Sequence, residues 1–130
     1  MCIRDRLCEE ADTGLLLDCA HLAIYQRMLG NAALDGLARF PLERVVEMHV
    51  AGGTEREVDG LPFVDDDHGT DILPDTWEIV EFVATRAPNL KAVVFECERN
   101  PLEACRPHFA RLAEVLRSSA LASKFAGPRS

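Results

Sequence analysis

Three short apolar segments, at residues 14–18, 45–50 and 91–96, constrain the fold of this chain more than any other feature. They are runs rich in Leu, Val or Phe, which is typical of strands buried on both faces of a parallel sheet. Segments with a helical pattern separate them, and parallel strands need crossover connections of this kind. The sequence therefore predicts an α/β fold with a parallel sheet and helices packed outside it.

Helix and turn signals define the connecting segments. Pro74 suits the first turn of a helix, and Gly30 is a typical helix stop. Residues 51–73 are rich in glycine and predict one long loop. Helices are predicted at residues 7–12, 21–29, 32–39, 74–87 and 101–121.

The length limits how much of a barrel this chain can form. It has 130 residues, enough for about three βα units, whereas a closed (β/α)8 barrel takes about 250 residues. We expect residues 7–121 to be the C-terminal part of a xylose-isomerase-like TIM barrel, and residues 122–130 to be a loose tail. Residues 1–6 resemble a translated adapter at the start of open reading frames from environmental assemblies, so we expect a non-native leader there.

Composition excludes several classes of protein. The 14 Lys and Arg against 22 Asp and Glu give a net charge of −8, which argues against nucleic-acid binding. No apolar run approaches the roughly 20 residues of a membrane-spanning helix. The five cysteines are irregularly spaced without a CxxC pair, which argues against a disulfide framework and a thiolate zinc site. A reducing cytoplasm is therefore the expected compartment.

Each predicted strand has a metal-binding residue type at or near its end, namely Asp18, His49 and Glu96. The carboxyl ends of parallel barrel strands meet at one mouth, so these residues should converge although they are distant in sequence. Side chains alternate along a strand, so Cys19 and Cys97 should point elsewhere and be small buried hydrophobes. The sequence predicts a metal site at this edge of the sheet.

The loop and the first helix add further candidates. Asp66 and His68 are two residues apart and project to the same side of an extended chain, although a solvated acidic turn is an alternative interpretation. His21, at the start of a helix, could share a cation with Asp18, or be an ordinary helix-terminal or core histidine. His108 has no candidate ligand near it in the sequence and is predicted to be a surface residue.

The candidate ligands contain carboxylates and imidazoles without thiolates. This donor set favours iron(II), manganese or zinc, and it leaves room for water or substrate. The number of candidates exceeds the four ligands of a tetrahedral ion, so a cluster of two or three metals is expected. The candidate ligands are Asp18, His21, His49, Asp66, His68 and Glu96.

Four short motifs in order, at residues 14–18, 47–52, 66–69 and 94–96, resemble a known family. They are similar to the multinuclear non-haem iron-dependent oxidases, long catalogued as a domain of unknown function. These are TIM-barrel enzymes that modify cysteines in ribosomally made peptides. The resemblance covers roughly residues 7–120, which correspond to the C-terminal part of such a protein.

The resemblance implies a barrel that holds two or three irons at its mouth and uses oxygen to remodel a peptidyl cysteine. A partner protein delivers the precursor peptide in this family. By likeness, the residues that hold iron are Asp18, His49, Asp66, His68 and Glu96.

Two departures from the family pattern lie beside this site. Many members have Asp-Val-Asn-Asn where this chain has Asp-Cys-Ala-His at residues 18–21, and many have a histidine where this chain has Gly53. Further histidine and glutamate ligands are expected from the N-terminal half of the barrel. The chain by itself is therefore expected to be inactive.

Two other functions stay open from the residues alone. One is a xylose-isomerase-like barrel that uses divalent metals for sugar isomerisation or phosphodiester hydrolysis. The other is a non-catalytic partial barrel that serves as an interaction module. A sheet cut from a barrel has two unpaired edges and an uncovered apolar face, so we expect the 130-residue chain to be oligomeric or poorly soluble.

Overall fold

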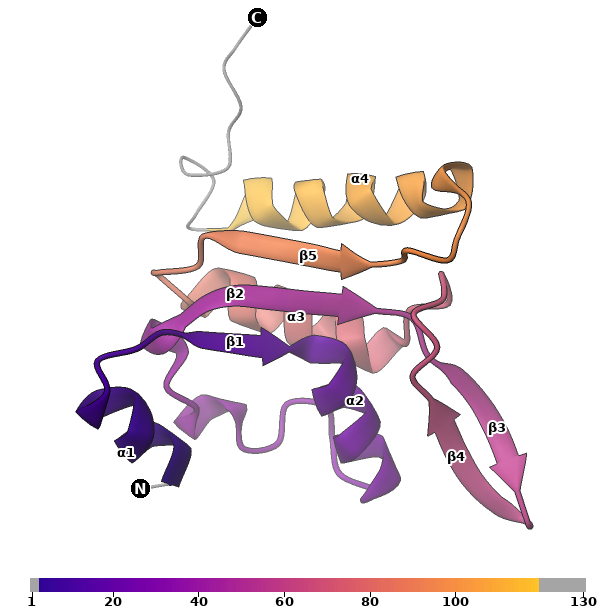
Figure 1. Cartoon of the computed structure of the whole chain (residues 1–130), viewed down its shortest axis with the longest axis horizontal. Helices are drawn as coiled ribbons and strands as arrows, with labels where there is room; N and C mark the ends of the chain where they lie inside the picture. The colour runs from indigo at the N-terminus through magenta and orange to yellow at the C-terminus, as the bar shows by residue number, and fades with distance from the viewer. Residues whose placement is uncertain (1–2, 120–130) are drawn as a thin grey trace, which may run out of the picture.

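The computed structural model describes residues 3–119, and its centre is a parallel sheet of three strands (Figure 1). The strands are β1 (Leu15–Asp18), β2 (Val45–Ala51) and β5 (Ala92–Glu96), in the order β1-β2-β5. Asp18 pairs with His49, and Ala51 pairs with Glu96. This arrangement confirms the predicted parallel α/β sheet.

Four α-helices flank the sheet in the described part of the chain. Asp18 is the N-cap of the second helix, and Pro74 starts the third as predicted. The predicted end of the last helix at residue 121 and the predicted tail at 122–130 lie outside the described residues. The helices are α1 (Ile3–Glu10), α2 (Cys19–Met28), α3 (Pro74–Arg86) and α4 (Leu102–Ser118).

The predicted helix at residues 32–39 is wrong. This segment forms turns and one short 3-10 helix, η1 (Leu37–Arg39), and a second 3-10 helix, η2 (Leu42–Arg44), follows. Gly36 has a φ of 79°, a left-handed conformation that an α-helix cannot continue through. Glycine therefore interrupts a segment whose apolar spacing is otherwise helical.

The predicted long loop at 51–73 contains a β-hairpin, which corrects that prediction. Strands β3 (Thr54–Val58) and β4 (Leu61–Asp65) pair antiparallel and extend away from the main sheet (Figure 1). Asp59 and Gly60 have φ values of 52° and 78°, as a two-residue type I′ turn requires. The Asp-Gly pair is the sequence signal for this hairpin.

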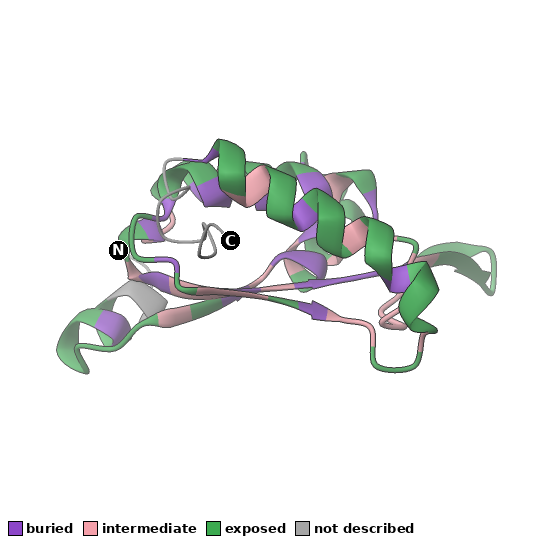
Figure 2. Cartoon of the chain, turned by 90° about the horizontal axis from the view of Figure 1, so that it is seen from above, coloured by how far each residue is buried: buried purple, intermediate pink, exposed green. Residues whose placement is uncertain are grey.

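The two faces of the main sheet differ in burial. On one face, Met48, Val50 and Phe95 are buried in the core beneath α3 and α4. On the opposite face, Leu16 is 51% exposed and Val94 is 38% exposed. Figure 2 shows α3 and α4 on one side of the sheet only. The candidate metal ligands of the strands therefore belong to the uncovered face.

Candidate metal centre

The ends of the strands bring three predicted ligands together. Asp18, His49 and Glu96 each offer one ligand atom, and these atoms all lie within 4.8 Å of one another. Nδ1 of His49 lies 3.1 Å from Oε1 of Glu96. All three side chains are half-buried, so solvent or a ligand can reach them while neighbours hold them in place. Alternation along the strands correctly predicted that they share one face.

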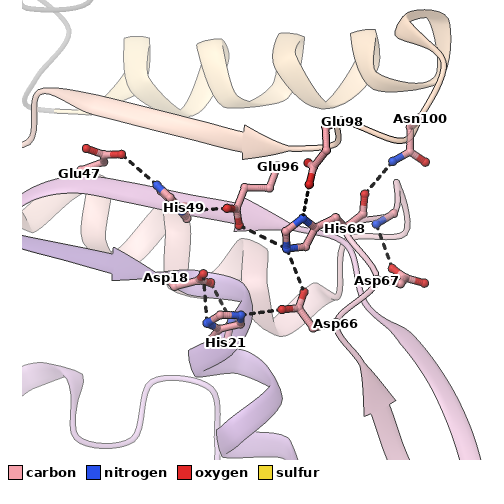
Figure 3. Close-up of polar contacts among 11 residues, drawn as sticks. Asp18, His21, Glu47, His49, Asp66, Asp67, His68, Glu96, Glu98 and Asn100 are labelled. Atoms are coloured by element: carbon pink, nitrogen blue, oxygen red, sulfur yellow. Dashed lines mark hydrogen bonds and ion pairs between the residues drawn. The ribbon is translucent and has the colours of Figure 1, made fainter.

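The segment after the hairpin brings His68 and Asp66 to the same edge of the sheet (Figure 3). Nε2 of His68 lies 3.8 Å from Oε2 of Glu96 and 3.9 Å from Oδ1 of Asp66. Glu96 thus faces two imidazoles, with Oε1 toward His49 and Oε2 toward His68. A carboxylate in this position can bridge two cations.

Asp67 braces this loop and does not face the cluster. Its Oδ2 accepts a hydrogen bond of 2.5 Å from the Thr54 hydroxyl, and its Oδ1 accepts one of 2.9 Å from the Gly69 amide. The hydrogen bond from Thr54 is the main reason that the pKa of Asp67 is lowered. The side-chain amide of Asn100 donates to the His68 carbonyl at 2.7 Å. His68 itself has a φ of 52°, so these bonds hold the backbone in an unusual conformation.

Close packing between two glycines sets the distance between β2 and this loop. A Cβ atom added to Gly52 would lie only 2.3 Å from the carbonyl oxygen of Gly69. The amide of Gly53 also donates to the carbonyl oxygen of Asp71 at 3.0 Å. Glycine at position 52 is therefore needed for the loop to reach the ends of the strands.

His21 links two carboxylates of the cluster. Oδ1 of Asp18 accepts a hydrogen bond of 2.9 Å from the His21 backbone amide, which caps helix α2. In the side chain of His21, Nδ1 lies 3.2 Å from Oδ2 of Asp18 and Nε2 lies 2.6 Å from Oδ2 of Asp66. The structure therefore places all six predicted site residues in one connected network (Figure 3).

One buried oxygen in the network fits a bound cation. Among the described residues, Oδ1 of Asp66 is a buried side-chain atom without a hydrogen-bond partner. An unsatisfied buried carboxylate oxygen is costly, and a metal ion is one of the partners that would satisfy it. The surrounding donors are oxygens and imidazole nitrogens, which suit iron, manganese or zinc. The residues present therefore fit a metal ion.

The excess of carboxylates changes the pKa of both central histidines. Partial burial lowers the pKa of His49, but the hydrogen bond to Glu47 and the charge of Glu96 outweigh it and raise the pKa overall. The pKa of His68 is raised chiefly by its hydrogen bond to Glu98. Both shifts show that the cluster favours positive charge.

Two carboxylates of the network were not among the predicted site residues. Glu47 lies 2.9 Å from Nε2 of His49, and Glu98 lies 2.9 Å from Nδ1 of His68. The spacing of Glu47 and His49, two residues apart on one strand, is a signal that could have identified the first pair. Nothing in the sequence pairs Glu98 with His68, because they are 30 residues apart and meet only in the fold.

The remaining predictions concern cysteines and His108. Cys19 is fully buried in the core, as predicted, and burial raises its pKa. Cys97 is half-buried against the core, and desolvation raises its pKa to about 11. The prediction that His108 lies on the surface is wrong, because its half-buried ring contacts Trp77 and Phe95 at centroid distances of 6.4 and 5.4 Å.

Several proteins are similar to this chain. A UPF0276 protein of Rhizobium meliloti (strain 1021) is 35% identical over 71 residues, which are 54% of this chain and 23% of that protein. A UPF0276 protein of Neisseria meningitidis serogroup B (strain ATCC BAA-335 / MC58) is 27% identical over 110 residues, which are 81% of this chain and 38% of that protein. A UPF0276 protein of Acaryochloris marina (strain MBIC 11017) is 33% identical over 72 residues, which are 55% of this chain and 25% of that protein.

The chain thus spans between 23% and 38% of the length of these curated relatives. In residues 3–119, no helix has the length and apolar character needed to cross a bilayer. Over residues 3–117 the sequence matches the family described as RiPP precursor modification enzyme MbnB/TglH/ChrH; the chain belongs to this family, which confirms the resemblance found in its motifs.

Proposed function

We propose that this chain provides part of the metal centre of an iron-dependent oxidative enzyme that acts on a cysteine of a ribosomally made peptide. The observation that supports it most is the convergence of Asp18, His49 and Glu96, with ligand atoms within 4.8 Å of one another. The family adds the substrate class, since its members modify precursor peptides. The donor set adds the metal class, because it lacks thiolates and suits iron(II).

Four of the six candidate ligands form two pairs beside Glu96. His49 faces its Oε1 and converges with Asp18, whereas His68 faces its Oε2 and lies beside Asp66. If two ions are bound, Asp18 and His49 would hold one, Asp66 and His68 would hold the other, and Glu96 could contribute to both; a third ion would need further ligands. His21 contacts carboxylates of both pairs and is retained as a candidate ligand.

The residues of this chain would hold the metal in position for its substrate. Their carboxylates balance the charge of the metal, and their imidazoles offer nitrogen donors at defined positions. When bound, iron supplies the redox chemistry for oxidising a peptidyl cysteine with oxygen; manganese is an alternative, and zinc would limit the site to non-redox chemistry. The half-buried ligands lie at the carboxyl ends of the strands, where the mouth of a barrel would give a thiol-bearing peptide access to the cluster.

We further propose that residues 7–121 form the C-terminal part of a xylose-isomerase-like TIM barrel. Support comes from the parallel order β1-β2-β5 and from the packing of α3 and α4 on one face. The exposed apolar side chains of Leu16 and Val94 would then face the barrel interior. Ligands and a peptide-delivering partner protein beyond this chain would complete the enzyme, so the chain alone should be inactive.

Anaerobic titration with iron(II) tests the metal centre. The chain should bind iron, and Glu96→Gln should weaken binding by at least about tenfold, because it removes a charge beside both pairs of ligands. Glu114→Gln is the matched control, since Glu114 is exposed on α4 and should leave affinity unchanged. Equal affinities of all three proteins would refute the site.

A longer protein containing this chain tests the chemistry. Incubated with a cysteine-bearing precursor peptide, iron(II) and oxygen, it should change the mass of the peptide, and replacing the cysteine with serine should abolish the change. Loss of product without oxygen is also expected. Turnover of sugars or phosphodiesters under anaerobic conditions with manganese or zinc would contradict the oxidative proposal.

A further inference from the structure

Each central imidazole has one nitrogen facing the ligand cluster and the other facing a separate carboxylate (Figure 3). For His49, Nδ1 lies 3.1 Å from Glu96, whereas Nε2 lies 2.9 Å from Glu47. For His68, Nε2 faces Asp66 and Glu96, whereas Nδ1 lies 2.9 Å from Oε1 of Glu98. The two histidines therefore present opposite nitrogens to the cluster.

We propose that Glu47 and Glu98 are positioning residues that hold His49 and His68 in opposite tautomers. On this proposal, which rests on the metal centre proposed above, His49 binds metal through Nδ1 and His68 binds through Nε2. When metal is bound, each glutamate accepts the hydrogen of the imidazole nitrogen that does not bind metal.

The physical reason lies in the protons of a neutral imidazole. One nitrogen carries a hydrogen and the other carries the lone pair that a metal requires. An ionised carboxylate can only accept a hydrogen bond, so once metal occupies the nitrogen that faces the cluster, the outer glutamate accepts the hydrogen of the other nitrogen. Glu47 therefore holds the hydrogen on Nε2 of His49, and Glu98 holds it on Nδ1 of His68. The lone pairs then point toward Asp18, Asp66 and Glu96.

The positions of the two glutamates separate them from the ligands. Glu47 pairs with Leu16 and Ala92 in the sheet, two residues before the pair of Asp18 and His49 and on the same face. It is absent from the group of residues whose ligand atoms converge.

Glu98 follows β5 and contacts the outer nitrogen of His68. Its side chain is 62% exposed, against 37% for Glu47 and 23% for the candidate ligand Glu96. Water screens an exposed charge, so Glu98 should influence its histidine less than the more buried Glu47 does.

Nitrogen-resolved NMR tests the tautomers directly. Zinc serves as a diamagnetic probe on the ¹⁵N-labelled chain, whose four histidines give a simple long-range ¹H–¹⁵N spectrum. His49 should show metal bound at Nδ1 with hydrogen on Nε2, and His68 should show the reverse. Zinc on Nε2 of His49 or on Nδ1 of His68 would overturn this inference alone. A spectrum that zinc leaves unchanged would overturn the metal centre as well.

Variants of Glu47 separate positioning from a merely structural role. Glu47→Leu removes the acceptor and should weaken zinc binding about 10- to 100-fold, the range typical of such outer carboxylates. In Glu47→Gln, the side-chain amide can accept or donate a hydrogen bond, so the spectrum of His49 should show a mixture of tautomers. Glu98→Gln should have the same kind of effect on His68 at the lower end of that range.

Glu114→Leu, on the exposed surface of α4, is the control for the leucine substitution. Circular dichroism shows which variants are folded, and Glu47→Gln retains the shape of the side chain if Glu47→Leu fails to fold. A folded Glu47→Gln protein with a single tautomer and unchanged zinc affinity would refute the role of Glu47.

Discussion

Replacing Gly52 with alanine should disrupt the metal centre without touching any candidate ligand. The added Cβ would lie 2.3 Å from the Gly69 carbonyl oxygen, and ordinary contact begins at 3.4 Å, so the two segments must separate by 3.4 − 2.3 = 1.1 Å. Gly52 follows β2, the central strand of the sheet, so the loop at residues 66–69 should be the part that moves. A displacement of this size moves Asp66 and His68 away from Glu96.

Gly52→Ala should lower both the free energy of unfolding and the affinity for metal. Overpacking of this kind typically lowers the free energy of unfolding by about 1–3 kcal/mol. A misplacement of about 1 Å can cost a site on the order of 100-fold in function, so metal affinity should fall by at least about tenfold. Urea unfolding measures the first quantity, and anaerobic iron titration measures the second.

The neighbouring glycine supplies a matched control. A Cβ at Gly53 would lie 3.3 Å from its nearest neighbours, the Asp65 carbonyl oxygen and Cγ1 of Val64, so a shift of a few tenths of an ångström accommodates it. Gly53→Ala should therefore keep most of the metal affinity. If Gly52→Ala binds iron as tightly as Gly53→Ala, the close packing of glycines does not position the loop, and the reasoning fails.

Three further predictions concern the loop, the histidines and the uncovered face. Thr54→Val removes the hydrogen-bond donor to Asp67. The pKa of Asp67 is lower in the folded protein than in the unfolded chain, so its ionised form stabilises the fold above the unfolded-state pKa, and this stabilisation is lost as pH falls through the folded-state pKa. The free energy of unfolding of Thr54→Val, measured with urea between pH 3 and 7, should therefore depend less on pH than that of the wild type. Metal binds neutral imidazole, and the pKa values of His49 and His68 are raised, so affinity measured by titration should fall as pH decreases through those values and plateau above them. Leu16→Lys places charge on the uncovered face and should reduce self-association in light scattering, whereas a wild-type monomer would contradict the expected oligomer.

The strands of the β3–β4 hairpin could not be predicted from local apolar patterns. Strand β3 has the sequence Thr-Glu-Arg-Glu-Val, and β4 contains Pro62, so neither segment has the apolar alternation of a half-buried strand. Both strands are largely exposed, which explains the missing pattern. Only the Asp-Gly pair at residues 59 and 60, which adopts the positive φ values of a type I′ turn, indicates the hairpin in the sequence.

His108 shows a different limit. Its neighbours in sequence give no sign of an aromatic contact, because Trp77 and Phe95 come from α3 and β5. A half-buried position on an amphipathic helix depends on what the helix packs against. The sequence predicted the helix correctly, and the packing of α4 on the sheet decided the environment of this ring.

Local spacing was sufficient for the strands and for the convergence of three predicted ligands. A strand has a period of two residues, so the face of His49 follows from its sequence position, and parallel strands direct their carboxyl ends to one edge. The motifs were also sufficient to identify the family. These features depend on short-range geometry, which the order of residues specifies directly.

Tertiary structure alone decided how the loop and the outer carboxylates meet the strand ends. The approach of Gly52 to Gly69 and the bracing of Asp67 by Thr54 join segments whose separation depends on the hairpin. The contact between Glu98 and His68 likewise exists only because the chain folds back on itself. Distances between segments that are remote in sequence depend on how all the elements between them pack, and no local sequence pattern specifies that packing.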